Sequence, residues 1–121
     1  MLIIPPAAKA YVKIEPVDFR MGIDKLVALT SQKMQMDARS GAAFVFCNNK
    51  KTSIKVLYFD RQGYWLCQKR FSDGRMRNWP KEMDSQTLIL NLQELVVLLS
   101  DGDLSRMNFK KVFHSGENVA C

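Results

Sequence analysis

The chain has 121 residues, of which 47% are hydrophobic and 25% charged, and its formal net charge is +6. This length and composition fit one domain with a buried core and exclude extensive disorder. No segment approaches the roughly 20 apolar residues of a membrane-spanning helix, and the apolar run at 2–4 is too short for a signal peptide. We therefore expect one cytoplasmic domain at 1–104 that contacts no membrane, with a partly flexible C-terminal tail at 105–121.

The first third of the chain predicts a strand followed by a helix. Residues 10–14 alternate weakly between apolar and polar side chains, as a short strand does. Asp18 is placed to cap a helix, because its carboxylate can accept from the unpaired N–H groups of a first turn. Apolar side chains then recur every three or four residues from Phe19 to Met34. This spacing predicts a helix at about 19–36.

Residues 43–80 have the pattern of an antiparallel β-meander. Short apolar or β-branched segments are separated by polar loops and turns. Residues 60–63 and 72–74 are typical of tight hairpin turns in which a glycine takes positive φ. Pro80 ends the last strand, because proline cannot donate to a β-ladder. The segments that we expect as strands are 43–47, 54–59, 64–70 and 75–79.

The remainder of the expected domain predicts another short strand and a short helix. Residues 88–90 are apolar and suit a strand. Asn91 and Glu94 have the spacing of a capping box, and the leucines and valines that follow have helical spacing. The predicted fold class is α+β: an antiparallel β-meander of about three to five strands packed with an N-terminal helix and a short C-terminal helix at about 92–100.

The residue types needed for metal binding or catalysis are scarce. The cysteines are Cys47, Cys67 and Cys121, which form no CxxC pair, and His114 is the one histidine. This set does not match a zinc site or a disulfide framework, so we interpret Cys47 and Cys67 as small apolar residues of strands. No nucleophile has a base nearby, and no glycine-rich phosphate loop is present. We expect no cofactor, no metal, no catalytic residue and no enzyme activity.

The positive charge is concentrated in residues 44–81. This segment has nine Lys or Arg and two Asp, a net charge of +7, whereas the rest has nine basic and ten acidic residues, a net charge of −1. Hairpin pairing about the turn at 60–63 gathers the basic side chains at the opposite end of the sheet. A solvated β-surface without a partner would show the same bias. We predict a patch that contacts DNA phosphates through Lys50, Lys51, Lys55, Lys69, Arg70, Arg75 and Arg77.

Three aromatic residues near this patch have two possible roles. Tyr64, Trp65 and Trp79 either fill the core between sheet and helix, which we favour, or stack on exposed bases. The prediction is therefore a surface that contacts phosphates and does not read bases. Arg20, two residues after Asp18, is interpreted as an ion-pair partner of that residue rather than a ligand contact.

Three motifs in matching order resemble one bacterial family. The resemblance covers about residues 10–104. The motifs are VDFRMGIDKL at 17–26; FVF at 44–46 with IKVLYFD at 54–60, GYWL at 63–66, KRF at 69–71, GR at 74–75 and WP at 79–80; and QEL at 93–95 with LL at 98–99. Together they are similar to the second-open-reading-frame (Orf2-like) proteins, often called TnpB, of insertion sequence sixty-six type transposable elements.

The resemblance implies a protein that is required alongside a transposase for transposition. DNA binding and assistance to the transposase are the roles usually suggested for this family. The chain departs from it at residues 48–51, where the family tends to have an arginine-rich run and this chain has two lysines, which lack the bidentate fork of arginine. Two functions stay open: a DNA-binding accessory protein, or a protein–protein adaptor that assists the transposase of the same element without contacting DNA.

Overall fold

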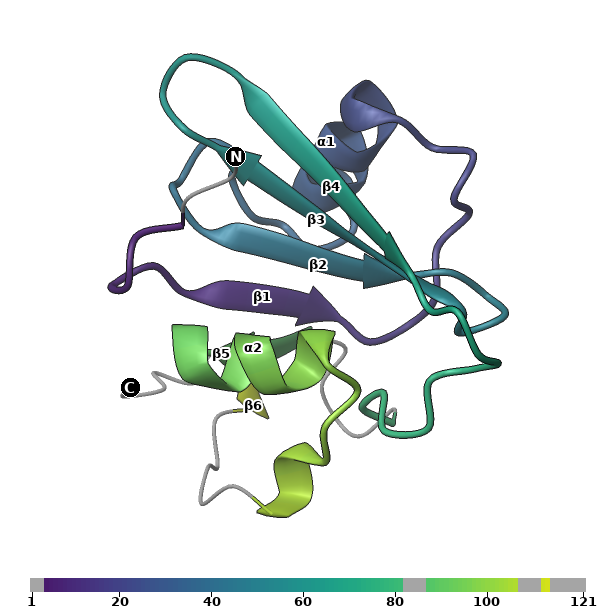
Figure 1. Ribbon diagram of the computed structural model, residues 1–121. Coiled ribbons are helices and arrows are strands. Elements are labelled where there is room, and N and C mark those ends of the chain that lie inside the picture. The colour runs from purple at the N-terminus through teal and green to yellow at the C-terminus, as the bar shows by residue number, and fades with distance from the viewer. Residues whose placement is uncertain (1–3, 82–86, 107–111, 114–121) are drawn as a thin grey trace.

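The computed structural model describes residues 4–81, 87–106 and 112–113, which form one mixed sheet with a helix on each face (Figure 1). The strand order is β4-β3-β2-β1-β5-β6. The strands are β1 (Ala10–Lys13), β2 (Ala43–Cys47), β3 (Ser53–Phe59), β4 (Tyr64–Arg70), β5 (Thr87–Leu90) and β6 (Val112–Phe113). The helices are α1 (Ile23–Gln32), α2 (Leu92–Leu99) and the single 3-10 turn η1 (Leu104–Arg106). The predicted α+β class is confirmed.

Strands β2, β3 and β4 form the expected antiparallel meander. Leu57 lies opposite Leu66 in the β3–β4 pair, which is the register that pairing about the predicted turn at 60–63 produces. The remaining strands correct the prediction of a simple meander. Strand β1 pairs parallel to β2 and antiparallel to β5, so the sheet is mixed. Strands β1 and β2 are parallel because the connection between them, which contains α1, returns the chain to the end of the sheet at which β1 begins.

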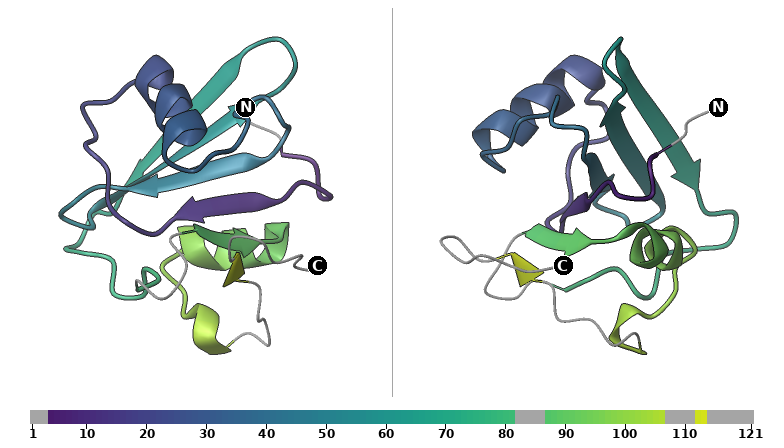
Figure 2. Two further views of the ribbon diagram at one scale, coloured as in Figure 1. Left: turned by 180° about the vertical axis from the view of Figure 1, so that it is seen from behind. Right: turned by 90° about the vertical axis from the view of Figure 1, so that its left-hand side faces the viewer.

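Helix α1 covers one face of the sheet and is shorter than the predicted helix at 19–36 (Figure 2). Its N-cap is Gly22, not Asp18. The Asp18 carboxylate instead accepts the Arg20 backbone N–H at 2.9 Å and forms the expected ion pair with its guanidinium, closing a turn before the helix. Phe19 and Met34 lie outside α1 but pack against the same core, so their helix-like spacing reflects a shared face and not a continuous helix.

Helix α2 covers the opposite face (Figure 2). The predicted capping box is confirmed: the Asn91 side chain accepts the Glu94 N–H at 2.8 Å, and the Glu94 carboxylate accepts the Asn91 N–H at 2.8 Å. At the other end, the Gly102 N–H bonds to the Val97 carbonyl at 2.8 Å, and Asp101 has a φ of 56°. This is a Schellman ending with aspartate in the left-handed position. No helix in the described ranges is long and apolar enough to cross a membrane.

The core has one layer on each side of the sheet. Because side chains alternate along a strand, the central strand β2 supplies both layers. Phe44 and Phe46 pack with Leu26 of α1, whereas Val45 packs with Leu95 of α2. All five residues of β2 are buried.

The segment at 75–79, expected as a strand, is irregular and bends around the end of the sheet. Its N–H groups have other partners: Met76 donates to the Lys51 carbonyl at 2.7 Å, and Arg77 donates to the Asp101 carboxylate at 3.0 Å. The Trp79 ring is buried, and its Nε1 donates to the Ile14 carbonyl at 2.9 Å. The segment therefore closes the core at this end instead of extending the meander.

The two predicted turns also differ in detail. Gly74 has the expected positive φ of 68°. In the turn at 60–63, however, Arg61 takes positive φ, at 81°, and Gly63 does not. The Asp60 carboxylate stabilises this turn by accepting the N–H groups of Gln62 and Gly63, each at 3.0 Å.

Candidate nucleic-acid interface

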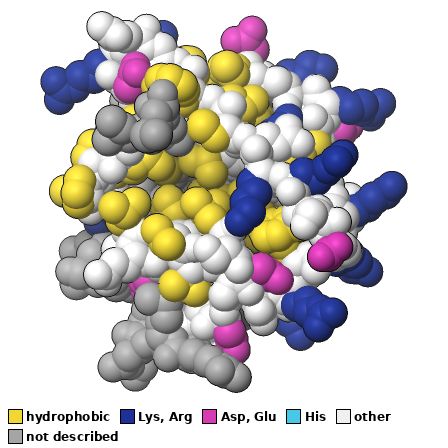
Figure 3. Space-filling model, in the orientation of Figure 1, with side chains coloured by type: hydrophobic (Ala, Val, Ile, Leu, Met, Phe, Trp, Pro, Cys, Tyr) yellow, Lys and Arg dark blue, Asp and Glu magenta, His cyan; other side chains and the backbone are white. Residues whose placement is uncertain are grey.

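Most of the basic side chains of residues 44–81 gather at one end of the sheet, where β2 ends, β3 begins and β4 ends (Figure 3). Backbone hydrogen bonds bring the two loops of this end together: Phe71 donates to the Thr52 carbonyl at 2.9 Å, and Met76 donates to that of Lys51. We call this surface the basic end. Its members are Lys50, Lys51, Lys69, Arg70, Arg75, Arg77 and Lys81.

The β2–β3 loop holds Lys50 and Lys51 on a fixed backbone. The Asn48 carboxamide oxygen accepts the Thr52 N–H at 2.8 Å and the Ser53 N–H at 3.1 Å. Lys51 takes a φ of 60°, which the tight loop requires. Lys50 is exposed and Lys51 is half-buried. Lys50 therefore projects from a loop whose backbone is already ordered, whereas the Lys51 side chain lies near the Cys47 thiol.

A second braced loop carries Arg75 and Arg77. The Asp101 carboxylate accepts the backbone N–H groups of Arg77 and Asn78, and the Asn78 carboxamide donates to the Asp101 carbonyl at 2.8 Å. These bonds tie the loop to the end of α2. The side chains of Arg75 and Arg77 are exposed.

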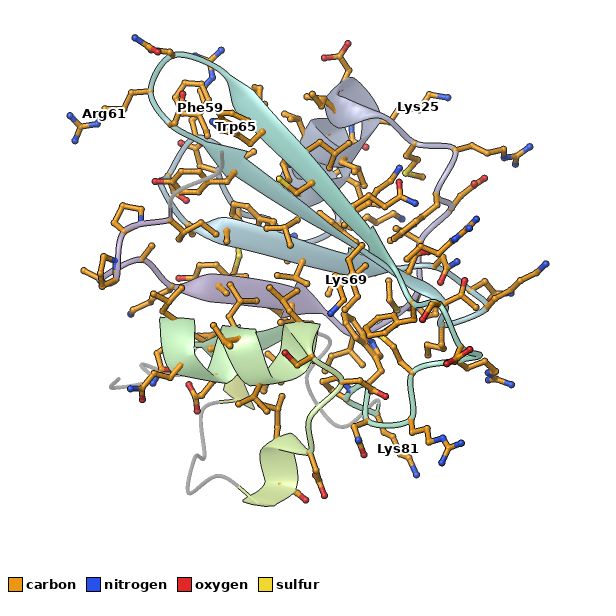
Figure 4. The ribbon with its side chains drawn as sticks, in the orientation of Figure 1. Lys25, Phe59, Arg61, Trp65, Lys69 and Lys81 are labelled. Atoms are coloured by element: carbon orange, nitrogen blue, oxygen red, sulfur yellow. The ribbon has the colours of Figure 1, made fainter. Side chains whose placement is uncertain are left out.

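Lys69 belongs to the basic end, but its ammonium already has partners. Its Nζ donates to the Leu99 carbonyl at 2.7 Å and lies 4.8 Å from the centre of the Phe71 ring. Figure 4 shows this side chain reaching toward the last turn of α2. A cation at a helix C-terminus stabilises the helix, because the last carbonyls have no partner within it. Lys69 therefore has a structural role at this position.

Lys55, which the sequence placed in the interface, lies on the other face of β3 and is buried, with 6% of its surface exposed. Its Nζ donates to the carbonyls of Phe19 and Met21, each at 2.9 Å, and lies 4.8 Å from the Phe19 ring centre. Burial lowers the pKa of its ammonium, and the nearby Asp18 partly opposes that shift. Lys55 holds the segment before α1 against the sheet and presents no charge at the basic end.

The cations of the basic end make no ion pair with any acidic side chain that the structure describes. The salt bridge between described residues, Asp18 to Arg20 at 2.7 Å, lies outside the basic end. Hydrogen bonds from Arg20 lower the pKa of the Asp18 carboxyl to about 2. The positive charges of the basic end are therefore not neutralised by neighbours within the described ranges.

The three aromatic residues have separate positions. Trp79 is buried, as the favoured interpretation expected. Trp65 is 38% exposed, and its Nε1 donates to the Asp60 carboxylate at 2.8 Å beside the turn at 60–63, at the opposite end of the sheet (Figure 4). Tyr64 is half-buried against the Phe59 ring, with ring centres 4.9 Å apart. None of the three presents an exposed ring at the basic end.

The thiols of the described strands are free. Cys47 is fully buried, as expected of a core residue, and burial raises the pKa of its thiol to about 11. Cys67 is half-buried. The third cysteine, Cys121, and the one histidine, His114, lie outside the described residues. Within those ranges, no three His, Cys, Asp or Glu side chains are grouped so that they could hold a metal ion.

The fold and this surface define a small α+β domain with a basic end to its sheet. A family model described as "IS66 Orf2 like protein" matches residues 8–109. The uncharacterized protein y4jC of Sinorhizobium fredii (strain NBRC 101917 / NGR234) is 31% identical over 101 residues, which cover 84% of this chain and 85% of that protein. No solved structure matches the chain. The chain belongs to the IS66 Orf2-like family of transposition-associated proteins, which confirms the resemblance drawn from its motifs.

Proposed function

We propose that this protein assists transposition by binding the phosphate backbone of DNA at the basic end, without catalysing a reaction step itself. The observation that supports this most is the position of Lys50, Arg75 and Arg77. All three are exposed, project from hydrogen-bonded loops, and have a side-chain charge that forms no ion pair with a described acidic residue.

This arrangement suits phosphate contacts rather than base reading. Lysine and arginine side chains that neutralise phosphates release counterions from DNA, which supplies affinity that does not depend on sequence. Lys55 and the ammonium of Lys69 are engaged within the protein, so they contribute least. If about five of the other basic side chains each meet one phosphate, the slope of log K against log salt is about −4.5.

The proposal is tested by titrating the protein into labelled duplex DNA at several salt concentrations. We expect binding at low salt that weakens steeply as salt rises and differs little between DNA sequences. Binding that is independent of salt, or no binding at low salt, would exclude the basic end as a phosphate-binding surface.

The alternative function is an adaptor that contacts the transposase of the same element and not DNA. Trp65 supports it, because this residue is a large exposed hydrophobic side chain on β4, the outermost strand of the sheet. An outer strand can accept a strand from a partner, and exposed aromatic residues often anchor such contacts. Co-purification with the transposase that survives nuclease treatment and is lost in Trp65→Ser would favour this function over DNA binding.

A further inference from the structure

A surface hollow of about 380 Å³ lies within the basic end. Four basic residues, Lys51, Arg75, Arg77 and Lys81, line it. No acidic residue is among the described residues that line this hollow, and the nearby Glu15 lines a separate one. Lys81 points away from the body of the molecule (Figure 4). Among the described residues, the side chains with a charge at this hollow are therefore all basic.

Part of the lining of the hollow is apolar. Met76 and Trp79 are buried at its base, with 7% and 6% of their surfaces exposed, and Pro16 and Pro80 are half-buried beside them. The hydrogen bond from the Met76 N–H to Lys51 and the one from the Trp79 indole fix the wall to the rest of the fold. The hollow is therefore a built feature and not a gap between unanchored loops.

We propose that this hollow binds an unpaired nucleotide of single-stranded DNA. The inference rests on the proposed function and narrows its ligand. A phosphate needs the cations alone, whereas the flat, weakly polar face of a base also gains from an apolar surface. Sites for single strands combine a basic groove with flat side chains, usually aromatic, that cover a base. Here the partly exposed apolar side chains are those of Pro16 and Pro80. The volume lies within the range of about 300–1,000 Å³ that small-ligand sites occupy.

A duplex would use only part of this surface. Its phosphates would reach the rim, but its bases are stacked and paired, so Pro16 and Pro80 would stay in contact with water or sugar. An unstacked strand can place phosphates on Arg75 and Arg77 while one base covers the prolines. The combination of rim and apolar base therefore favours a single strand over a duplex.

Three labelled probes with equal numbers of phosphates test this inference by fluorescence anisotropy at one low salt concentration: an oligothymidylate, an abasic oligonucleotide and a duplex. We expect the oligothymidylate to bind at least about fivefold more tightly than the other two. Equal binding of the abasic strand would show that no base enters the hollow, and equal or tighter duplex binding would overturn the preference for a single strand. If no probe binds at low salt, the proposed function itself fails.

Two substitutions assign the effect to the hollow. Pro80→Ser removes apolar ring surface without changing charge, and it should weaken oligothymidylate binding while leaving duplex binding unchanged. Arg75→Ala should weaken oligothymidylate binding more than the matched Arg70→Ala, because Arg70 is exposed on β4 and does not line the hollow. Loss of oligothymidylate and duplex binding to the same extent in Pro80→Ser would contradict the assignment. Thermal unfolding of each variant shows whether it is folded. The comparison of the three probes uses the wild-type protein, so it does not depend on any variant.

Discussion

The Asp101 carboxylate holds the backbone of Arg77, whose N–H group lies 3.0 and 3.1 Å from its two oxygens. Asp101 is also the left-handed residue that ends α2. One residue therefore joins the end of a helix to a loop that carries cations of the basic end. The position of these cations therefore depends on Asp101, which is negatively charged. In our proposal Asp101 does not contact the DNA phosphates.

Asp101→Gly tests this link. Glycine tolerates the positive φ, so the end of α2 should keep its conformation while the carboxylate bonds are lost. We expect the free energy of unfolding to fall by about 1–2 kcal/mol, measured by urea denaturation. DNA binding should weaken, although the protein gains one positive charge.

Asp73→Asn is the matched control, because it adds the same charge at an exposed turn residue. Its DNA binding should be unchanged or tighter. If both variants tighten binding equally, the charge alone matters and Asp101 does not position the loop.

Gly102→Ala should destabilise the protein through the same helix end. A Cβ atom at this position would lie 2.6 Å from Val97 Cγ1 and 3.0 Å from the Val97 carbonyl oxygen. We expect a loss of about 1–3 kcal/mol in the free energy of unfolding. Gly63→Ala is the control, since nothing lies within 4 Å of its added Cβ and its φ is not positive. Equal stability of the two variants would contradict the close packing at Gly102.

Lys55→Met tests whether Lys55 stabilises the fold or contacts DNA. The substitution removes two charged hydrogen bonds to the carbonyls of Phe19 and Met21, so we expect the free energy of unfolding to fall by about 1–2 kcal/mol. The salt dependence of DNA binding should not change, because the ammonium is buried. A smaller slope of log K against log salt in this variant would show that Lys55 contacts DNA.

The two strand cysteines should differ in reactivity toward a thiol reagent. With a pKa of about 11 for Cys47, only about one molecule in a thousand carries its thiolate at pH 8, and this fraction rises about tenfold per pH unit up to the pKa. In a Cys121→Ser background, we expect Cys67 to be labelled in the folded protein and Cys47 mainly after unfolding. Equal labelling rates at pH 8 would contradict the burial of Cys47.

The sequence predicted best those features that depend on neighbours along the chain. The β3–β4 register follows from a short turn, the capping box needs only Asn91 and Glu94, and the ion pair of Arg20 with Asp18 spans two residues. The class of the fold and the gathering of charge at one end of the sheet follow from these local elements.

Features that depend on distant packing were not predictable in this way. The irregular segment at 75–79 is determined by Asp101, 24 residues away from Arg77 in the sequence, and no local pattern marks that contact. The burial of Lys55 depends on the segment before α1, which covers its face of β3. The hollow also needs Pro16, which only the tertiary fold brings to Trp79 and Pro80.

The most direct test of the central claim compares two double variants of equal net charge. Lys50→Ala with Lys51→Ala removes two cations from the basic end, whereas Lys25→Ala with Lys33→Ala removes two exposed cations at and just after α1. The quantity measured is the slope of log K against log salt for duplex DNA. We predict that the first pair lowers the magnitude of the slope by about two and the second leaves it unchanged. An unchanged slope in the first pair, or the same decrease in both, would contradict DNA binding at the basic end.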